Sequence, residues 1–167
     1  DSRKIFSPET SLFFALKGTR DDGHQYISDL ILQGTRNFVI SNSSFLQSDK
    51  GDLFKVNFIL VEDTLQALQS LSVHHRKNFS YPVIGITGSN GKTIVKEWLY
   101  TLLREQYNIV RSPKSYNSQI GVPLSVWMMT EENNLGIFEA GISMKGEMEN
   151  LEKIIQPAIG IFTNIGT

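Results

Sequence analysis

The chain has 167 residues, enough for one medium domain or two small ones with a sizeable hydrophobic core. Hydrophobic residues make up 40% and charged residues 20%, with 16 Lys and Arg against 17 Asp and Glu, so the composition indicates an ordinary globular chain without the basic excess of a nucleic-acid-binding protein. The absence of cysteine excludes disulfides, thiolate metal sites and a cysteine nucleophile. No apolar run approaches the roughly 20 residues that cross a bilayer, and we expect a cytoplasmic protein.

Strand and helix patterns alternate over the first half of the chain. Apolar runs rich in branched and aromatic residues predict buried strands at residues 12–16, 37–40 and 57–61. Apolar positions at helical spacing predict a helix that ends near Gly34 and an amphipathic helix over residues 62–77. Polar residues and Pro82 follow, so we expect a domain boundary near residue 80, with one domain over residues 1–80 and another over 81–167.

The same alternation continues in the second half. Strands are predicted at residues 83–87, 108–110, 135–139 and 158–163. Helices are predicted at residues 92–105, 122–129 and 146–155. Strands that alternate with helices imply a parallel sheet, so the predicted fold class is α/β in both halves.

A glycine-rich loop joins the predicted strand at 83–87 to the predicted helix at 92–105. It has the short Gly-x-x-Gly-Lys-Thr form, since the strict P-loop spacing would need glycine where Ile86 stands. Glycines let successive backbone N–H groups face phosphate oxygens, Lys92 adds a positive charge for the terminal phosphates, and the Thr93 hydroxyl is a candidate Mg²⁺ ligand. The residues predicted to bind ATP are Gly88, Ser89, Asn90, Gly91, Lys92 and Thr93.

A phosphate loop needs an acid at the end of a neighbouring strand to position the metal. Residues 81–167 contain no Asp, so Glu139, at the end of a predicted strand, is the candidate Mg²⁺ ligand, with a solvated strand-end acid as the alternative. The loop at 115–123 follows another strand, and Asn117 and Ser118 offer hydrogen-bond donors to an anionic substrate. We therefore expect a metal and nucleotide site at one edge of the second sheet, with Lys92 and Glu139 as its catalytic residues.

The order and spacing of four motifs resemble the Mur ligases. These motifs are Thr87–Thr93, Tyr116–Pro123, Glu139–Gly141 and Thr163–Gly166. The first half agrees, because Asp1-Ser2-Arg3, the stretch Phe13–Gly18 and Asp22-Gly23-His24 resemble the UDP-binding domain of the MurE and MurF branch. The stretch from Val61 to Leu68 resembles the connection between domains in the MurF members, so the resemblance covers nearly the whole chain.

The resemblance implies an amide-forming ligase of peptidoglycan synthesis that uses ATP and Mg²⁺. In the MurF reaction, ATP phosphorylates the carboxylate of UDP-MurNAc-tripeptide, and the amine of D-Ala-D-Ala attacks the acyl phosphate. Carried over by position, Thr93 and Glu139 hold Mg²⁺, while Asn117 and Ser118 lie toward the substrate. The residues implied to meet the UDP moiety are Ser2, Arg3, Lys17, Gly18, Asp22, Gly23 and His24. For His24 a hydrogen bond that stabilises its own loop is the alternative role.

The resemblance also implies which further segments and domains belong to the complete protein. The stretch Ser115–Ser118 departs from the paired asparagines usual in stand-alone MurF and is closer to the MurF-like half of bifunctional proteins, which implies a possible fusion to a PLP-dependent alanine racemase. The chain starts without Met, and the resemblance places a metal-binding His, a carbamylated Lys, the adenine contacts and the acceptor domain after Thr167. We therefore expect an N-terminal fragment without a complete catalytic centre.

Three alternatives remain open from the sequence. One is another Mur ligase such as a MurE-like enzyme, and one is a noncatalytic nucleotide-binding module of a fused racemase. The third is a generic P-loop NTPase, such as a kinase or GTPase, against which the lack of Asp after residue 80 and of a base-reading motif argues.

Overall fold

The computed structural model describes residues 7–18, 21–47 and 55–166, and the chain divides into two compact units, Asp1–Leu68 and Gln69–Thr167. The division falls inside helix α3 (Thr64–Arg76), earlier than the expected boundary near residue 80. The reason is that the second half of α3 bonds to the second unit: Ser72 Oγ donates to Pro123 O at 3.3 Å, and Arg76 Nε donates to Ile155 O at 2.9 Å. Thr64 Oγ1, at the start of α3, donates instead to Ala15 O at 3.1 Å.

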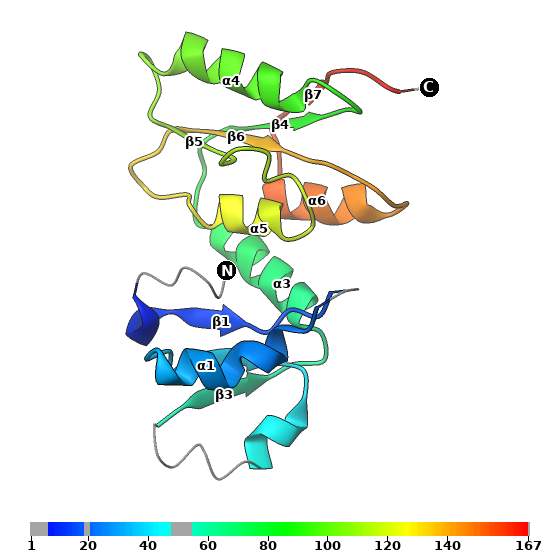
Figure 1. Cartoon of the computed structure of the whole chain (residues 1–167). Helices are drawn as coiled ribbons and strands as arrows, with labels where there is room; N and C mark the ends of the chain where they lie inside the picture. Colours follow the sequence, from blue (N-terminus) through cyan, green and yellow to red (C-terminus); the bar gives the residue numbers. More distant parts are fainter. Residues whose placement is uncertain (1–6, 19–20, 48–54, 167) are drawn as a thin grey trace. The chain divides into compact units, whose positions relative to one another are not determined.

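The described residues of the first unit form a small parallel sheet with a short α-helix, short 3₁₀ helices and the start of α3 (Figure 1). The strands are β1 (Leu12–Phe14), β2 (Asn37–Ile40) and β3 (Asn57–Leu60), in the order β1-β2-β3, and the helices are α1 (Ile27–Leu32), η1 (Pro8–Thr10), η2 (Gly23–Tyr26) and η3 (Ser43–Gln47). The register sets Phe13 opposite Phe38 and Phe38 opposite Phe58, so three aromatic rings form a row on one face of the sheet. Phe38 is fully buried, and α1 adds Ile27 and Leu30 to this core.

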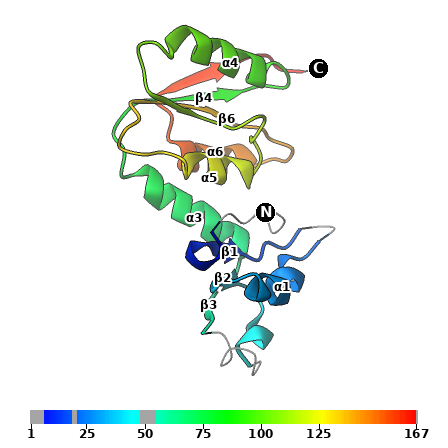
Figure 2. The same cartoon turned by 60° about the vertical axis from the view of Figure 1, so that its left-hand side comes forward.

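The second unit is a four-stranded parallel sheet between two layers of helices (Figures 1 and 2). Its strands have the order β5-β6-β4-β7. In chain order the elements are β4 (Val83–Thr87), α4 (Lys92–Leu103), β5 (Ile109–Arg111), α5 (Gly121–Val126), β6 (Leu135–Glu139), α6 (Glu147–Ile155) and β7 (Ile159–Phe162). Helix α4 covers one face of the sheet, and α5 and α6 cover the other.

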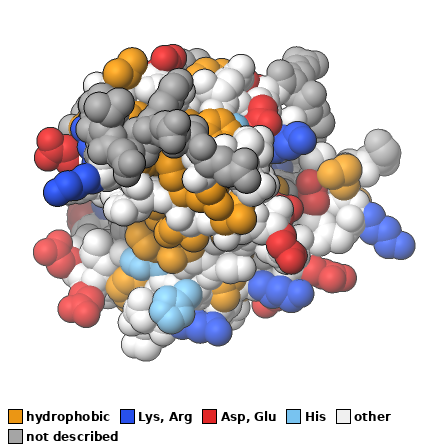
Figure 3. Space-filling model, turned by 90° about the horizontal axis from the view of Figure 1, so that it is seen from below, with side chains coloured by type: hydrophobic (Ala, Val, Ile, Leu, Met, Phe, Trp, Pro, Cys, Tyr) orange, Lys and Arg blue, Asp and Glu red, His pale blue; other side chains and the backbone are white. Residues whose placement is uncertain are grey.

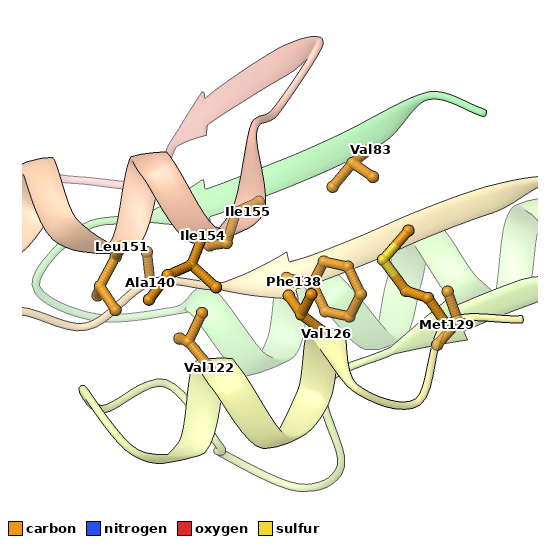
Figure 4. Close-up of a cluster of buried hydrophobic side chains, with 10 residues drawn as sticks. Val83, Val122, Val126, Met129, Phe138, Ala140, Leu151, Ile154 and Ile155 are labelled. Atoms are coloured by element: carbon orange, nitrogen blue, oxygen red, sulfur yellow. The ribbon is translucent and has the colours of Figure 1, made fainter. Parts of the chain in front are cut away.

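Alternate residues of the central strands supply the two cores. Val83 and Phe138 face α5 and α6, where they meet Val126 and Leu151 (Figure 4). The residues of β4 and β6 that face the other way, such as Ile86, pack with partly buried side chains of α4. This two-sided burial explains why the strands are continuous apolar runs in the sequence.

The predicted strands and helices and the α/β fold class are confirmed, with ends that differ by a few residues. Within residues 7–18, 21–47 and 55–166, none of the helices combines the length and the apolar character that crossing a bilayer demands. On the face shown in Figure 3, basic and acidic side chains are interspersed.

Candidate functional site

The loop between β4 and α4, which we call the phosphate loop (Gly88–Thr93), depends on two glycines with positive φ. Gly88 has φ +133° and Gly91 has φ +83°, a region that side-chain-bearing residues rarely adopt. A Cβ atom on Gly88 would lie 2.2 Å from Thr163 Oγ1, so the position has no room for a side chain either. Gly91 is the residue before α4, and the N–H groups of Lys92 and Thr93 open that helix, where donors lack intrahelical partners. The start of α4 is therefore suited to an anion.

The segment after β7 holds the phosphate loop in place. The N–H of Ser89 donates to Asn164 O at 3.0 Å, and the N–H of Asn90 donates to Asn164 Oδ1 at 2.8 Å. In return, the N–H of Gly166 donates to Ser89 Oγ at 2.7 Å. The sequence predicted that successive loop N–H groups face phosphate oxygens, but those of Ser89 and Asn90 are engaged by Asn164 here. The donors at the start of α4 remain for that purpose.

A pocket of about 330 Å³ opens beside the phosphate loop. It is lined by Thr87, Gly88, Ser89, Lys92, Ile142, Phe162, Asn164 and Ile165. The Lys92 ammonium folds back over the loop and donates to Gly88 O at 2.5 Å. Lys92, the first residue of α4, thus contributes a positive charge to the lining of this pocket, which suits the terminal phosphates of a nucleotide.

Glu139 lies fully buried at the carboxyl end of β6, against the phosphate loop. Strand pairing sets it opposite Ile86, and Thr93 Oγ1 donates to Glu139 Oε2 at 3.0 Å. The other oxygen, Oε1, accepts no hydrogen bond from the residues that the structure describes, although Lys96 Nζ lies 2.9 Å away as an ion-pair partner. This burial and these contacts rule out a solvated strand-end acid.

The hydroxyl and carboxylate of this pair fit Mg²⁺, which prefers oxygen ligands and binds through one or two carboxylates together with phosphates and water. No group of three His, Cys, Asp or Glu side chains suited to a metal occurs in the part of the chain that the structure describes. A cage made of protein ligands alone is therefore absent from those residues, and a metal held jointly with a nucleotide is the arrangement that the site accommodates.

Asn117 and Ser118 lie in the loop between β5 and α5. Asn117 O accepts from the N–H of Gly141 at 2.8 Å, and a Cβ on Gly141 would lie 2.9 Å from Asn117 Cγ, so this loop packs directly against the segment that follows Glu139. Ser118 Oγ accepts from the N–H of Gly121 at 3.1 Å and so helps to start α5. The fold brings Asn117 to the same sheet edge as Glu139, whereas the Ser118 side chain already has a structural partner.

The loop after β1 in the first unit contains the other predicted substrate contacts. Lys17 and Asp22 form an isolated antiparallel bridge, and the N–H of Gly18 donates to Asp21 O at 2.8 Å. A Cβ on Gly23 would lie 2.8 Å from Leu16 N, which explains the glycine there. Ser2 and Arg3 lie outside the described residues.

His24 is buried in this loop, and both of its ring nitrogens have protein partners. Nδ1 lies 2.6 Å from Asp22 Oδ1, and Nε2 accepts from the N–H of Ser41 at 3.0 Å. The hydrogen bond from the His24 backbone N–H holds the pKa of the Asp22 carboxyl below its usual value, and the side-chain bond to His24 adds to this effect. Both ring nitrogens thus bond within the protein, which agrees with the alternative role for His24, a hydrogen bond that stabilises its own loop.

Comparison with known proteins connects these features. The family described as Mur ligase middle domain matches residues 86–167, which include the phosphate loop, Glu139 and the segment after β7. The chain belongs to the Mur ligase family. Its relatives include UDP-N-acetylmuramoyl-tripeptide–D-alanyl-D-alanine ligases of Bacillus subtilis and Treponema pallidum, each 36% identical over 99% of this chain and over 35% and 37% of their own lengths.

Solved Mur ligase structures share the fold. MurF from Acinetobacter baumannii superposes with a TM-score of 0.88 at 29% identity over 100% of this chain and 35% of that one. MurF from Thermotoga maritima in complex with ADP gives 0.84 at 31% identity over 99% of this chain and 36% of that one. The chain therefore spans about a third of the length of the Mur ligases it matches.

Three residues of this Mur ligase site were not found by sequence reasoning. They are Lys96, Ser112 and Asn164. Lys96 carried a usable signal, because it lies three residues after Thr93 on a helix whose next turns, at Leu99 and Leu103, pack into the core. A lysine on the buried side of a helix needs a partner. Asn164 lies in the Thr163–Gly166 motif, although no role was assigned to it, and Ser112 carried no comparable signal, since it acts through contacts between distant segments.

Proposed function

We propose that this chain is the UDP-substrate-binding and phosphate-binding part of an ATP-dependent ligase that joins D-Ala-D-Ala to UDP-MurNAc-tripeptide. The observation that carries the proposal is the buried carboxylate of Glu139 bonded to Thr93 at the start of α4, beside the Lys92 pocket. A loop for phosphates next to a buried acid suits phosphoryl transfer, and it does not suit a module that only docks a partner.

The MurF relatives supply the substrates in this proposal, because their printed names give both reactants. Under the proposal, the first unit binds the UDP end through residues of the loop after β1, together with Ser2 and Arg3; the loop residues are Lys17, Gly18, Asp22, Gly23 and His24. The second unit binds the ATP phosphates through the phosphate loop. Asn117 faces the substrate from the neighbouring loop.

The proposed chemistry has two steps. A carboxylate oxygen of the tripeptide attacks the γ-phosphorus of ATP, a C–O–P linkage forms and ADP leaves; Lys92 and the N–H groups at the start of α4 stabilise the charge on the phosphate oxygens. The amine of D-Ala-D-Ala then attacks the acyl carbon, an amide forms, phosphate leaves and the amine loses a proton. Thr93 and Glu139 would hold Mg²⁺, which supplies charge neutralisation at the phosphates.

The test is phosphate release by the complete protein with ATP, Mg²⁺, UDP-MurNAc-tripeptide and D-Ala-D-Ala. Release that requires both UDP-MurNAc-tripeptide and D-Ala-D-Ala supports the proposal. Release with a single amino acid in place of D-Ala-D-Ala would indicate a MurE-like ligase, and nucleotide binding without release would indicate a noncatalytic module. The racemase fusion stays a prediction from the Ser115–Ser118 stretch, and alanine racemisation by the same polypeptide would test it.

A further inference from the structure

Lys96 is a fully buried cation in the middle of α4 that the proposed phosphoryl transfer does not use. Burial of an ammonium group is costly unless charges and hydrogen bonds compensate it. Its Nζ atom lies 2.9 Å from Glu139 Oε1 and 3.2 Å from Glu97 Oε1, and it donates to the carbonyl oxygens of Ser112, at 2.9 Å, and Lys114. The side chain is therefore compensated by partners from three separate segments.

These partners connect the end of β5 to the end of β6. Ser112 makes two hydrogen bonds at this connection: its carbonyl oxygen accepts from Lys96, and its Oγ accepts from the N–H of Glu139 at 3.1 Å. Lys114 has φ +49°, a conformation that costs a non-glycine residue about 1 kcal/mol or more, and its carbonyl is held by Lys96. The ammonium thus fixes the turn that leads to Asn117 as well as the carboxylate of Glu139.

The two oxygens of Glu139 have different neighbours as a result. Oε1 is next to Lys96, and Oε2 accepts from Thr93 Oγ1 on the preceding turn of the same helix. Thr93 and Lys96 are three residues apart, so they lie on one face of α4 and contact the carboxylate together. A carboxylate held at one oxygen by a buried cation presents the other in a fixed direction, toward the phosphate loop.

We propose that Lys96 is a positioning residue that orients Glu139 for the nucleotide-bound Mg²⁺ and fixes the start of the substrate loop at Ser112–Asn117. The inference rests on the proposed function only for the presence of a metal–nucleotide complex at this site. The identity of the ligase substrates does not enter it. Lys92 acts on phosphates directly, whereas Lys96 acts through Glu139.

The test is a double-mutant cycle read by calorimetry of ADP binding to the complete protein, with and without Mg²⁺. The variants are Lys96→Met, which keeps the length of the side chain without its charge, Glu139→Gln, and both together. Lys153→Met, which removes an exposed lysine from α6, is the matched control.

We expect Lys96→Met to lower the gain in ADP affinity that Mg²⁺ provides by about tenfold, the scale on which residues that orient metal ligands act. Metal-free ADP binding should change far less, and the control should change neither quantity. In the Glu139→Gln background, Lys96→Met should cause no further loss. Effects of Lys96→Met and Glu139→Gln that multiply, or an equal loss of metal-free and metal-dependent binding, would overturn the proposal.

If Lys96→Met fails to fold, the reason is that the Glu139 carboxylate is left buried without its counter-charge. Glu139→Gln and the double variant both lack this carboxylate, so the comparison of their ADP binding still tests the proposal. Unchanged ADP binding, with and without Mg²⁺, supports the proposal, and a further loss contradicts it. Because the readout is nucleotide binding, a wild-type protein that binds Mg²⁺ and ADP but fails to join the proposed substrates would overturn the proposed function alone.

Discussion

Each unit buries a titratable side chain at the carboxyl ends of its strands, His24 in the first and Glu139 in the second, and the two differ in what their polar atoms do. His24 uses both ring nitrogens, one with Asp22 and one with the N–H of Ser41. Glu139 has Oε1 beside the Lys96 ammonium, 2.9 Å away, and its Oε2 accepts from the hydroxyl of Thr93 in the phosphate loop. His24 therefore stabilises the loop that contains it, whereas Glu139 has one oxygen fixed by a buried cation and the other directed toward the phosphate loop.

The largest expected effect tests the second unit. Lys92→Ala in the complete protein should lower ATP-dependent phosphate release by about 10³-fold or more, because the positive charge at the terminal phosphates is removed. UDP-substrate binding measured by calorimetry should remain, since the predicted uridine contacts lie in the first unit. An equal loss of UDP-substrate affinity would show that the two roles are not separate.

Glu139→Gln should lower Mg²⁺-dependent turnover by about 10²-fold or more, since residues that only support a metal ligand already cost 10- to 100-fold. The amide is an uncharged ligand, and residues 81–167 contain no Asp to replace it. Turnover measured across a Mg²⁺ titration checks this, with the exposed Glu152→Gln on α6 as the control. Wild-type turnover at every Mg²⁺ concentration would remove Glu139 from the metal site.

His24→Ala should act on stability and spare the phosphate chemistry. The variant leaves the N–H of Ser41 without its acceptor and removes the side-chain bond to Asp22, which keeps only the bond from the backbone N–H of residue 24, so the free energy of unfolding of the first unit should fall by about 1–3 kcal/mol. Urea denaturation measures this, and the exposed His74→Ala is the control. Unchanged stability together with lost UDP-substrate binding would instead make His24 a ligand contact.

The smallest expected effect is the pH dependence of Asp22. Its pKa is lowered in the folded chain, chiefly by the hydrogen bond from the His24 N–H, so its carboxylate stabilises the fold above the unfolded pKa of about 3.9. That contribution is lost as pH falls through the lower folded pKa. Asp22→Asn should therefore differ most from wild type in Tm near pH 5 and least near pH 2. A difference that does not shrink on acidification would contradict the assignment. Because the Asp22 side chain is half exposed, the difference should be small.

The local elements could be predicted because their causes are local. The helix expected at 62–77 and observed at Thr64–Arg76 shows its apolar spacing in the sequence. The division of that helix between two units was not visible, because the acceptors of Ser72 and Arg76 lie 51 and 79 residues further along the chain. The boundary near residue 80 was inferred from polar residues and a proline, which mark the end of a helix and carry no information on its partners.

For the site, the sequence by itself determined the phosphate loop, with glycines where φ is positive, and a buried strand that ends in Glu139. Only the tertiary structure decided which groups meet. Strand β4 pairs with β6 and β7 rather than with β5, its successor in sequence, and this order sets Glu139 beside Thr93 and brings Asn164 to the loop. Backbone conformation and burial pattern depend on neighbouring residues, but the order of parallel strands depends on how crossover helices pack, so the burial of Lys96 against Glu139 emerges only in the folded chain.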